Sequence, residues 1–299
     1  MARYARFLCA SLASLGLCAA AAPASVGTKL GATVEGDSVA IEMTDSGNVG
    51  IAVPFKEAGG TDFTDLWWSG PGESGWGLSI VQHRDTLFSV IYAYGSSGLP
   101  AWYVMSGGTW NAERTAYTGA LYAPQGSPFH AYDASRLNVG ASVGSMTITF
   151  TDASHATLDY TINGVTDRKE IARQRFGSGS GFNIPIHADM WWGGTAQNGW
   201  GVAVLEQFNT LFAIWFTYDD DGQATWLVMP SGSWSATDVY EGRIYRTRSS
   251  PWLGRRYNLF AFRISDVGSF RLRFTGDTAT LEYVIDGRSG TLPLSRQPF

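Results

Sequence analysis

The sequence predicts an all-β protein made of two tandem antiparallel up-and-down β-barrels of about eight strands each. Three observations lead to this prediction. A unit of about 110 residues occurs twice, apolar and polar residues alternate within each copy, and short turn sequences separate the alternating runs. Because a closed barrel has no unpaired edge strand, the turn-linked strands favour barrels over sandwiches.

The repeat is aligned by its tryptophans. The segment Asp65 to Trp68 recurs 124 residues later as Asp189 to Trp192, and Ser74 to Gly77 recurs as Asn198 to Gly201. Ten of the 12 Trp fall into matched pairs, and each slip of the offset to 123 falls in a polar stretch, where insertions are tolerated. We therefore expect two copies of one domain.

Alternation within each copy is typical of half-buried antiparallel strands. Met146, Ile148 and Phe150 alternate with threonines, as Leu158, Tyr160 and Ile162 alternate with polar residues. Turn sequences such as Asn163-Gly164 separate the runs. In the first copy we expect strands that start near Gly75, Leu87, Ala101, Tyr117, Asn138, Met146, Thr157 and Lys169.

One strand in each copy departs from this alternation. Leu87 to Tyr94 and Leu211 to Tyr218 are apolar or aromatic on both faces. A strand that is buried on both faces needs a further layer outside the barrel. We expect the two barrels to pack against each other through these strands, with Ile91 facing outward; a homodimer formed through the same strands is the alternative.

The N-terminal residues have the pattern of a secretory signal peptide. Arg3 and Arg6 precede an apolar run from Phe7 to Ala19, and the small residues Ala22 and Ala24 then form a cleavage pattern. Removal of residues 1–24 takes away both cysteines and lowers the formal charge from −5 to −7. We expect an exported protein, periplasmic or extracellular, without disulfides or thiol ligands.

The remaining boundaries follow from composition and from the repeat. We expect a Gly-rich leader with one β-hairpin over 25–62, the first Trp-rich barrel over 63–176, a Gly/Ser linker over 177–186 and the second barrel over 187–299. In the leader, the hairpin is predicted from Val39 to Met43 and from Val49 to Phe55.

Composition excludes several classes of protein. The negative net charge argues against nucleic acid as a partner, because phosphate neutralisation needs an excess of Lys and Arg. After the first 24 residues, no apolar run approaches the length of a transmembrane helix. The four histidines have no ligand spacing and the mature chain has no cysteine, so we expect no metal site and no cofactor. Nucleophile-elbow, phosphate-loop and dinucleotide-binding motifs are also absent from the sequence.

The matched aromatic residues are the candidate ligand-binding site. Their large flat faces could stack on a sugar or another flat molecule at the barrel mouths, or they could fill the core instead. The candidates are Trp67, Trp68, Trp76, Tyr94, Trp102 and Trp110 of the first copy and Trp191, Trp192, Trp200, Tyr218, Trp226 and Trp234 of the second.

No catalytic residue is predicted. Glu73 is the one acidic residue of its turn, but Gln197 occupies the matched position, so at most one copy could use it as a catalytic acid. Arg173 and Arg296 match near the end of each copy, where they suit a bond that closes the barrel as well as a ligand contact.

The order of these motifs suggests a family. Glu-Ser-Gly-Trp-Gly at 73–77, Tyr-Asp-Asp-Asp-Gly at 218–222, Thr-Trp-Leu-Val-Met at 225–229 and Gly-Arg-Ile-Tyr-Arg at 242–246 resemble a largely uncharacterised Trp-rich repeat domain of exported proteobacterial proteins. The resemblance implies export and a modular domain, here in tandem, and it implies no activity. The strand count is also similar to that of avidin- and lipocalin-like barrels, by analogy.

These observations favour an exported, non-enzymatic binding protein that holds a small apolar or glycan-like ligand through Trp-lined barrel mouths. One alternative is a surface interaction or adhesion module, in which the loops Ser127 to Leu137 and Ser250 to Leu259 contact a partner protein. A hydrolase using Glu73 is a further alternative. The last alternative is an outer-membrane barrel of about 16 strands, but Pro293, Ser295 and Gln297 interrupt the alternation expected before the final Phe299.

Overall fold

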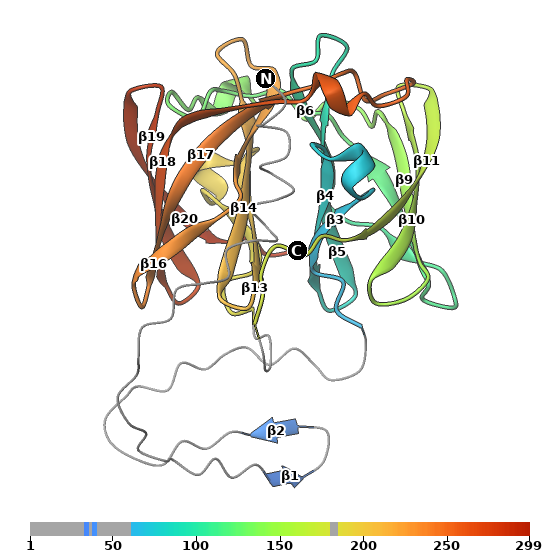
Figure 1. Ribbon diagram of the computed structural model, residues 1–299, viewed down its shortest axis with the longest axis horizontal. Helices are drawn as coiled ribbons and strands as arrows, with labels where there is room; N and C mark the ends of the chain where they lie inside the picture. Colours follow the sequence, from blue (N-terminus) through green and yellow to red (C-terminus); the bar gives the residue numbers. More distant parts are fainter. Residues whose placement is uncertain (1–32, 36–37, 41–60, 180–184) are drawn as a thin grey trace.

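The computed structural model describes residues 33–35, 38–40, 61–179 and 185–299. The chain is all-β, and two barrel-like domains stand side by side (Figure 1), as the sequence predicts. The predicted signal peptide lies outside the described residues, as does most of the predicted leader hairpin. Of the leader, the structure describes the short strands β1 (Thr33–Glu35) and β2 (Ser38–Ala40), which pair antiparallel.

The first barrel is a meander in which neighbours along the chain are neighbours in the sheet. Its strands are β3 (Asp65–Trp68), β4 (Gly77–His83), β5 (Thr86–Tyr94), β6 (Pro100–Met105), β7 (Thr109–Trp110), β8 (Ala116–Leu121), β9 (Gly144–Phe150), β10 (His155–Ile162) and β11 (Val165–Arg173), with the 3₁₀ turns η1 (Pro71–Glu73) and η2 (Ala134–Arg136). The sheet order is β6-β5-β4-β3-β11-β10-β9-β8-β7.

The second barrel repeats this order. Its strands are β12 (Asp189–Trp192), β13 (Gly201–Gln207), β14 (Thr210–Tyr218), β15 (Ala224–Met229), β16 (Gly232–Ala236), β17 (Val239–Arg248), β18 (Arg263–Thr275), β19 (Thr278–Ile285) and β20 (Arg288–Arg296), with η3 (Thr195–Gln197) and η4 (Leu259–Ala261). The sheet order is β15-β14-β13-β12-β20-β19-β18-β17-β16.

Closure differs between the two barrels. Pairing of β15 with β17 closes the second barrel, with Leu227 opposite Arg246 and Val228 opposite Tyr245. In the first barrel the corresponding edges meet at the single bridge of Val104 and Tyr122, whose two backbone hydrogen bonds are both 2.9 Å long. The second sheet is therefore a closed barrel, and the first is a curled sheet with its edges almost joined.

One strand predicted from the sequence is wrong. No strand starts near Asn138; residues 138–143 form a loop, in which Asn138 makes an isolated bridge with Gln125. One strand absent from the prediction is β3, a strand of four residues that contains Trp67 and Trp68. The loop contains Gly140 at φ 69°, a left-handed backbone conformation that interrupts a strand, and the alternation of its residues does not show this.

The matched arginines close each meander. Arg173 at the end of β11 pairs with Asp65 of β3 at 3.2 Å, and Arg296 at the end of β20 pairs with Asp189 of β12 at 2.7 Å. Each guanidinium also lies over the first Trp of its barrel, at 5.1 Å from the ring of Trp67 in the first. These contacts join the first and last strands, which is the structural role considered for both arginines.

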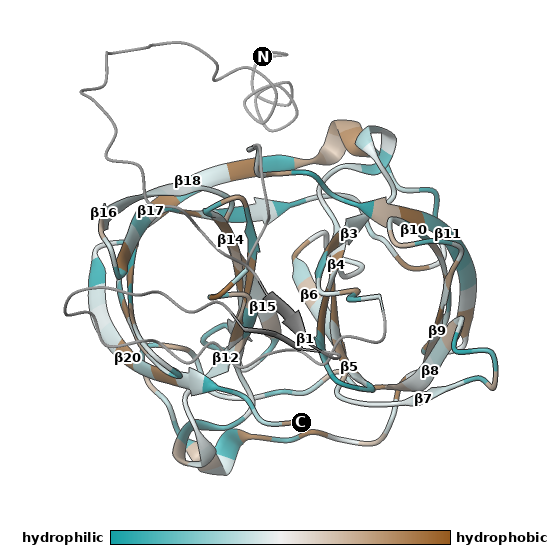
Figure 2. Ribbon diagram, turned by 90° about the horizontal axis from the view of Figure 1, so that it is seen from below, coloured by the Kyte–Doolittle hydropathy of each residue, from teal (hydrophilic) through white to brown (hydrophobic). Residues whose placement is uncertain are grey.

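The two barrels pack against each other mainly through β6 and β15. The predicted strands β5 and β14 also lie at this interface, because aromatic residues of β5 contact Trp226 of β15 and those of β14 contact Trp102 of β6. The indole of Trp102 donates a 2.9 Å hydrogen bond to the carbonyl oxygen of Thr217, and the matched Trp226 donates at 3.1 Å to that of Ala93. Each contact is repeated with the copies exchanged. The interface is therefore isologous, as in a two-fold symmetric dimer, but lies within one chain (Figure 2).

A polar contact at this interface has the same symmetry. A ring nitrogen of His83 lies 2.8 Å from Asp189 Oδ1, and the matched Gln207 donates at 2.9 Å to Asp65 Oδ1. The side chains that meet across the interface are therefore at matched positions of the repeat, as are the strands that carry them.

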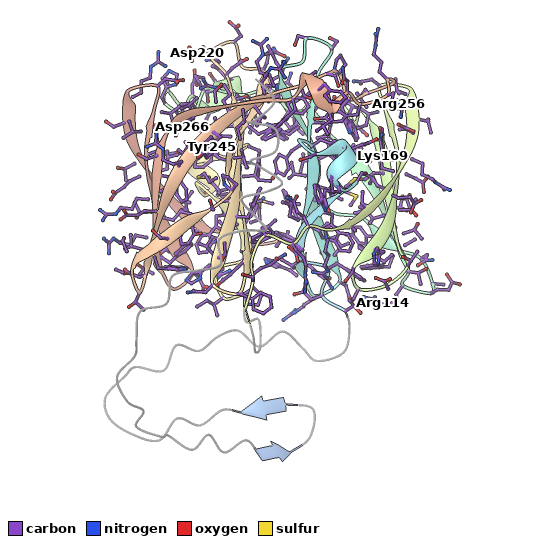
Figure 3. All side chains as sticks on the ribbon, viewed as in Figure 1. Arg114, Lys169, Asp220, Tyr245, Arg256 and Asp266 are labelled. Carbon is purple, nitrogen blue, oxygen red and sulfur yellow. The ribbon has the colours of Figure 1, made fainter. Side chains whose placement is uncertain are left out.

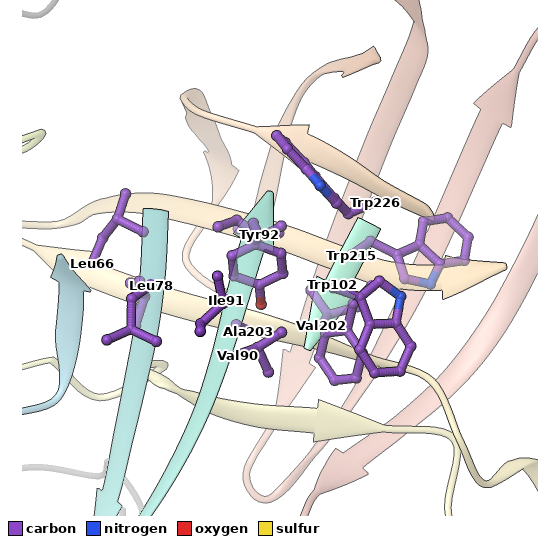
Figure 4. Close-up of a cluster of buried hydrophobic side chains, with 14 of the residues drawn as sticks. Leu66, Leu78, Val90, Ile91, Tyr92, Trp102, Val202, Ala203, Trp215 and Trp226 are labelled. Carbon is purple, nitrogen blue, oxygen red and sulfur yellow. The ribbon is translucent and has the colours of Figure 1, made fainter. Parts of the chain in front are cut away.

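The expected orientation of Ile91 is wrong. Its neighbour Tyr92 contacts Trp226 of the second barrel, at 5.8 Å between ring centroids (Figure 4). Because side chains alternate along a strand, Ile91 faces the interior of its own barrel. Both faces of β5 are apolar, so the sequence does not distinguish the inward face from the outward face.

Candidate functional site

A long loop from each barrel covers the mouth of the other barrel. The loop over 249–262, between β17 and β18, crosses the top of the first barrel (Figure 1), where the amide of Trp252 donates at 3.1 Å to the carbonyl oxygen of Tyr94. The loop over 122–143 meets the second barrel, where the amide of Gly126 donates at 3.2 Å to Gly222. The loops that the interaction-module alternative assigns to a partner protein thus contact the other half of this chain.

The first barrel is plugged by Trp252. This indole is fully buried and stacks on Tyr160, with ring centroids 4.6 Å apart and an interplanar angle of 19°. It also contacts Trp76 at 5.0 Å. The indole nitrogen of Trp252 is buried and has no hydrogen-bond partner among the residues described.

The second barrel receives the matched residue, Phe129. Its ring lies 5.1 Å from Trp215 and 5.4 Å from Tyr283. Trp215 occupies the wall position that Ile91 has in the first barrel, so the larger wall residue faces the smaller plug. In each barrel, one large and one smaller side chain occupy the wall and plug positions, which keeps the total side-chain volume similar, as close packing of an interior requires.

A cluster of charged residues lies in the mouth of the first barrel. Lys169 of β11 donates at 3.0 Å to Glu73 Oε1 of η1, while the other carboxylate oxygen of Glu73 accepts at 3.0 Å from the indole of Trp76. Lys169 also lies 3.8 Å from Asp167, which accepts a 3.4 Å hydrogen bond from the hydroxyl of Tyr160. Figure 3 shows Lys169 in the upper half of the barrel, away from Arg114 at the lower end.

The cluster is partly withdrawn from water. The side chain of Lys169 is 12% exposed and that of Glu73 is 28% exposed. Burial raises the pKa of Tyr160, and the negative charges of Asp167 and Glu73 raise it further. Burial likewise raises the pKa of Tyr257, in the covering loop, to about 12. Both phenols are therefore neutral hydrogen-bonding groups beside the ion pair near neutral pH.

The second barrel has no such cluster. Gln197 stands in place of Glu73, Leu292 in place of Lys169 and Gly290 in place of Asp167. The side-chain oxygen of Gln197 is buried without a hydrogen-bond partner in the described residues. The two barrels share strand order and aromatic packing, so the charged cluster is a property of the first barrel alone.

The predicted site residues do not form one site. The structure distributes them over four environments, in matched pairs. The interface of the barrels contains Tyr94, Trp102, Tyr218 and Trp226, and the barrel interiors contain the buried Trp67, Trp76, Trp191 and Trp200. The walls carry the half-buried Trp68 and Trp192. The last pair, Trp110 and Trp234, is half-buried and donates to carbonyls of the β4–β5 and β13–β14 turns. Of this set, Trp76 contacts the charged cluster directly.

Four residues of this site, Asp167, Lys169, Tyr160 and Trp252, are not among those predicted from the sequence. The sequence held a signal for two of them. Asp167 and Lys169 stand at alternate positions that should face the barrel interior, where the second copy has the uncharged residues Gly290 and Leu292. Trp252 had no such signal, because its position inside the other barrel depends on the path of a loop.

Histidines of the described chain contact single carboxylates and do not cluster with one another. His187 lies 3.2 Å from Glu206, and His155 lies 2.9 Å from Asp152 on the surface. In the parts of the chain that are described, no group of three or more His, Cys, Asp or Glu side chains could hold a metal ion. The same residues include no helix long and apolar enough to cross a membrane.

Two surface hollows lie elsewhere. One, of about 640 Å³, is on the outer wall of the second barrel over β17–β20, where Arg271 pairs with Glu241 at 2.7 Å. Its aromatic residues, Phe270 and Tyr283, are buried and offer no exposed ring face. The other, of about 190 Å³, lies between the barrels beside the Asp65–Arg173 pair. The mouth of the first barrel differs from both hollows in combining an ion pair with the ring faces of Trp76, Tyr160 and Trp252.

No family model, curated protein or solved structure matches this chain.

Proposed function

We propose that this protein is an exported, non-enzymatic binding protein that holds a small glycan-like ligand in the mouth of its first barrel. The observation that carries the proposal is the Glu73–Lys169 ion pair set among aromatic rings. Partial burial of charges costs free energy, and the second barrel has the same strand order with Gln197 and Leu292 instead. The shared fold therefore does not require these charges, whereas a polar ligand would use them.

The chemistry of the cluster favours a glycan-like ligand over an apolar one. A sugar ring has apolar faces, which pack on aromatic rings such as those of Trp76 and Tyr160, and hydroxyls that need hydrogen-bond partners. Glu73 and Asp167 supply acceptors, and Lys169 supplies donors. An apolar ligand would remove these groups from water without replacing their hydrogen bonds.

Trp252 occupies the place where the ligand would stack. Its ring lies on Tyr160 and against Trp76, so binding requires the loop over 249–262 to move the indole aside. This requirement selects for ligands with a flat face, which can replace the lost ring contact with Tyr160. The N-terminal residues 1–24, with their signal-peptide pattern, support export.

The test is titration of the protein with a panel of mono- and oligosaccharides while its tryptophan fluorescence and the heat of binding are measured. The deciding variant is Glu73→Gln combined with Lys169→Leu, which installs the residues of the second barrel. We expect a glycan that binds the wild-type protein to lose at least tenfold in affinity, about 1.4 kcal/mol, because its hydroxyls lose charged partners.

A matched control removes an ion pair of the same chemistry on the outer wall, by Glu241→Gln with Arg271→Leu. Binding should be unchanged in this control. Absence of binding by every glycan, or equal binding by the Glu73/Lys169 variant, would overturn the proposal. Cleavage of a bound glycan by the wild-type protein but not by Glu73→Gln would assign a hydrolase instead.

A further inference from the structure

A single aromatic side chain projects from the loop that covers the first barrel. Phe260, in η4, is 89% exposed and is the most exposed large hydrophobic residue of the described chain. In Figure 2 the hydrophobic colour of η4 stands at the outer edge of the molecule, next to the start of β18. Exposure of a Phe side chain to water costs free energy, so we ask what its exposed position contributes.

The position of Phe260 is fixed on both sides. The side chain of Asn258 caps η4 by accepting a 3.0 Å hydrogen bond from the amide of Phe260. Tyr257 before it and Phe262 after it are both buried, and both come within 2.5 Å of a β-carbon placed on Gly75 of the first barrel. The exposed ring is therefore held outward by its buried neighbours.

Four exposed arginines, at positions 248, 255, 256 and 263, lie in the loop with this ring or at its two ends. Arg248 and Arg263 lie directly opposite each other on β17 and β18, which places like charges side by side. Arg263 donates at 2.8 Å to the carbonyl oxygen of Phe260, so this charge is held at the backbone of the residue that carries the exposed ring. Arg255 and Arg256 follow in the same loop, and none of the four arginines has an ion-pair partner within the described ranges.

Neighbouring arginines on the same strand behave differently. Arg243 pairs with Asp266 at 2.6 Å, and Arg246 pairs with Asp286 at 2.8 Å. The acidic residues near this end of β17 are thus already engaged. In a chain whose formal net charge is −5, the loop forms a local cationic surface around an apolar tip.

The first copy shows that the fold does not need this surface. The matched loop has the same capped 3₁₀ turn, with Asp133 at the cap and Leu137 against Gly199. Ser135 stands in place of Phe260, and the loop lacks the two residues that add Arg255 and Arg256. Both loops cover a barrel mouth, so Phe260 and its arginines serve another purpose.

We infer that Phe260 and the arginines Arg248, Arg255, Arg256 and Arg263 dock this protein onto the surface of an anionic lipid bilayer. The arginines would meet lipid phosphates, and the ring would enter the boundary between headgroups and acyl chains. A bilayer accepts one projecting ring without a matching pocket, whereas a protein partner would need a larger apolar surface around it. A soluble polyanion would engage the arginines and leave the ring in water.

The test is co-sedimentation of the full mature protein with vesicles of phosphatidylcholine alone and with vesicles that also contain phosphatidylglycerol. We expect binding to the anionic vesicles that decreases with added salt, and little binding to the neutral ones. Phe260→Ser, which installs the first-copy residue, should weaken binding about tenfold or more. Arg255→Ser with Arg256→Ser should weaken it about fivefold per arginine and reduce its salt dependence.

Matched controls are Ser135→Ala and Arg136→Ser in the loop of the first copy, which should bind as the wild-type protein does. All altered side chains are exposed, and unchanged thermal unfolding confirms that each variant is folded. Equal binding to neutral and anionic vesicles, or full binding by Phe260→Ser, would overturn the inference. Tight binding of heparin that is unaffected by Phe260→Ser, without vesicle binding, would assign a soluble polyanion instead.

Discussion

Trp252, which belongs to the second barrel, stacks on Tyr160 inside the first barrel, with ring centroids 4.6 Å apart. The matched residue Phe129 of the first barrel packs on Trp215 inside the second, at 5.1 Å. Each barrel thus completes the core of the other. We therefore expect the two barrels to unfold as one cooperative unit rather than as independent domains.

Trp252→Ala should lower the free energy of unfolding by about 3–5 kcal/mol, because it empties a fully buried position in the first barrel. Urea unfolding followed by circular dichroism measures the change. Phe129→Ala is the control, and its effect should be smaller because Phe129 is only partly buried. A smaller loss of unfolding free energy for Trp252→Ala than for Phe129→Ala would show that Trp252 does not contribute to the core of the first barrel.

Trp102→Phe and Trp226→Phe should each lower the free energy of unfolding by about 1–3 kcal/mol, and by similar amounts. Each change removes the indole donor from a buried backbone carbonyl, of Thr217 in one case and Ala93 in the other. Differential scanning calorimetry of the two variants tests this equivalence. Separation of the single transition into two in either variant would mean that these hydrogen bonds hold the barrels together.

Gly75→Ala should destabilise the protein, whereas Gly72→Ala should be nearly neutral. Gly75 has φ 119°, and a β-carbon there would lie 2.5 Å from the ring of Phe262. Gly72 has no atom within 4 Å of that position and is three residues away. Thermal melts of both variants check the prediction, and equal melting temperatures would contradict the close approach of the covering loop at Gly75.

Asp65 should make stability depend on pH. Burial raises the pKa of this carboxyl above its ordinary value of 3.8, and outweighs the hydrogen bond from Leu66 and the contacts with Gln207 and Arg173. The folded state therefore binds the proton more tightly than the unfolded state. Between about pH 3.8 and the folded pKa, the contribution of Asp65 to the free energy of unfolding falls as pH rises.

Asp65→Asn removes this contribution. The stability of the wild-type protein relative to the variant should fall by about 1.4 kcal/mol per pH unit inside that window and then level off. Urea unfolding of both proteins at a series of pH values measures the difference. A difference that instead increases with pH would show that pairing with Arg173 and Gln207 outweighs burial.

Much of the fold could be predicted because it depends on local pattern. The alternation of Met146, Ile148 and Phe150 reports an inward and an outward face directly, and turn pairs such as Asn163-Gly164 mark the ends of strands. Strand β3 was harder, because four residues around two tryptophans are too short to show alternation. The predicted strand at Asn138 is a loop held by a left-handed glycine, which hydrophobicity does not report.

The candidate site was less predictable, because its residues come from distant parts of the chain. Glu73 was visible as a lone acid in a turn, but its ion pair with Lys169 depends on how β11 meets η1 in a curled sheet. Trp252 reaches the site from the other barrel. A repeat aligns equivalent positions and does not show that equivalent loops are exchanged.

The sequence by itself determined that this protein consists of two copies of one β-domain, because 124-residue periodicity and two-residue alternation are properties of the chain alone. It also determined that β5 and β14 need a partner outside the barrel, since both of their faces are apolar. Only the tertiary structure decided that this partner is the other copy and that Trp252 and Phe129 cross between the barrels. The physical reason is that apolar surface must be buried but does not specify against what, whereas packing and hydrogen-bond geometry do.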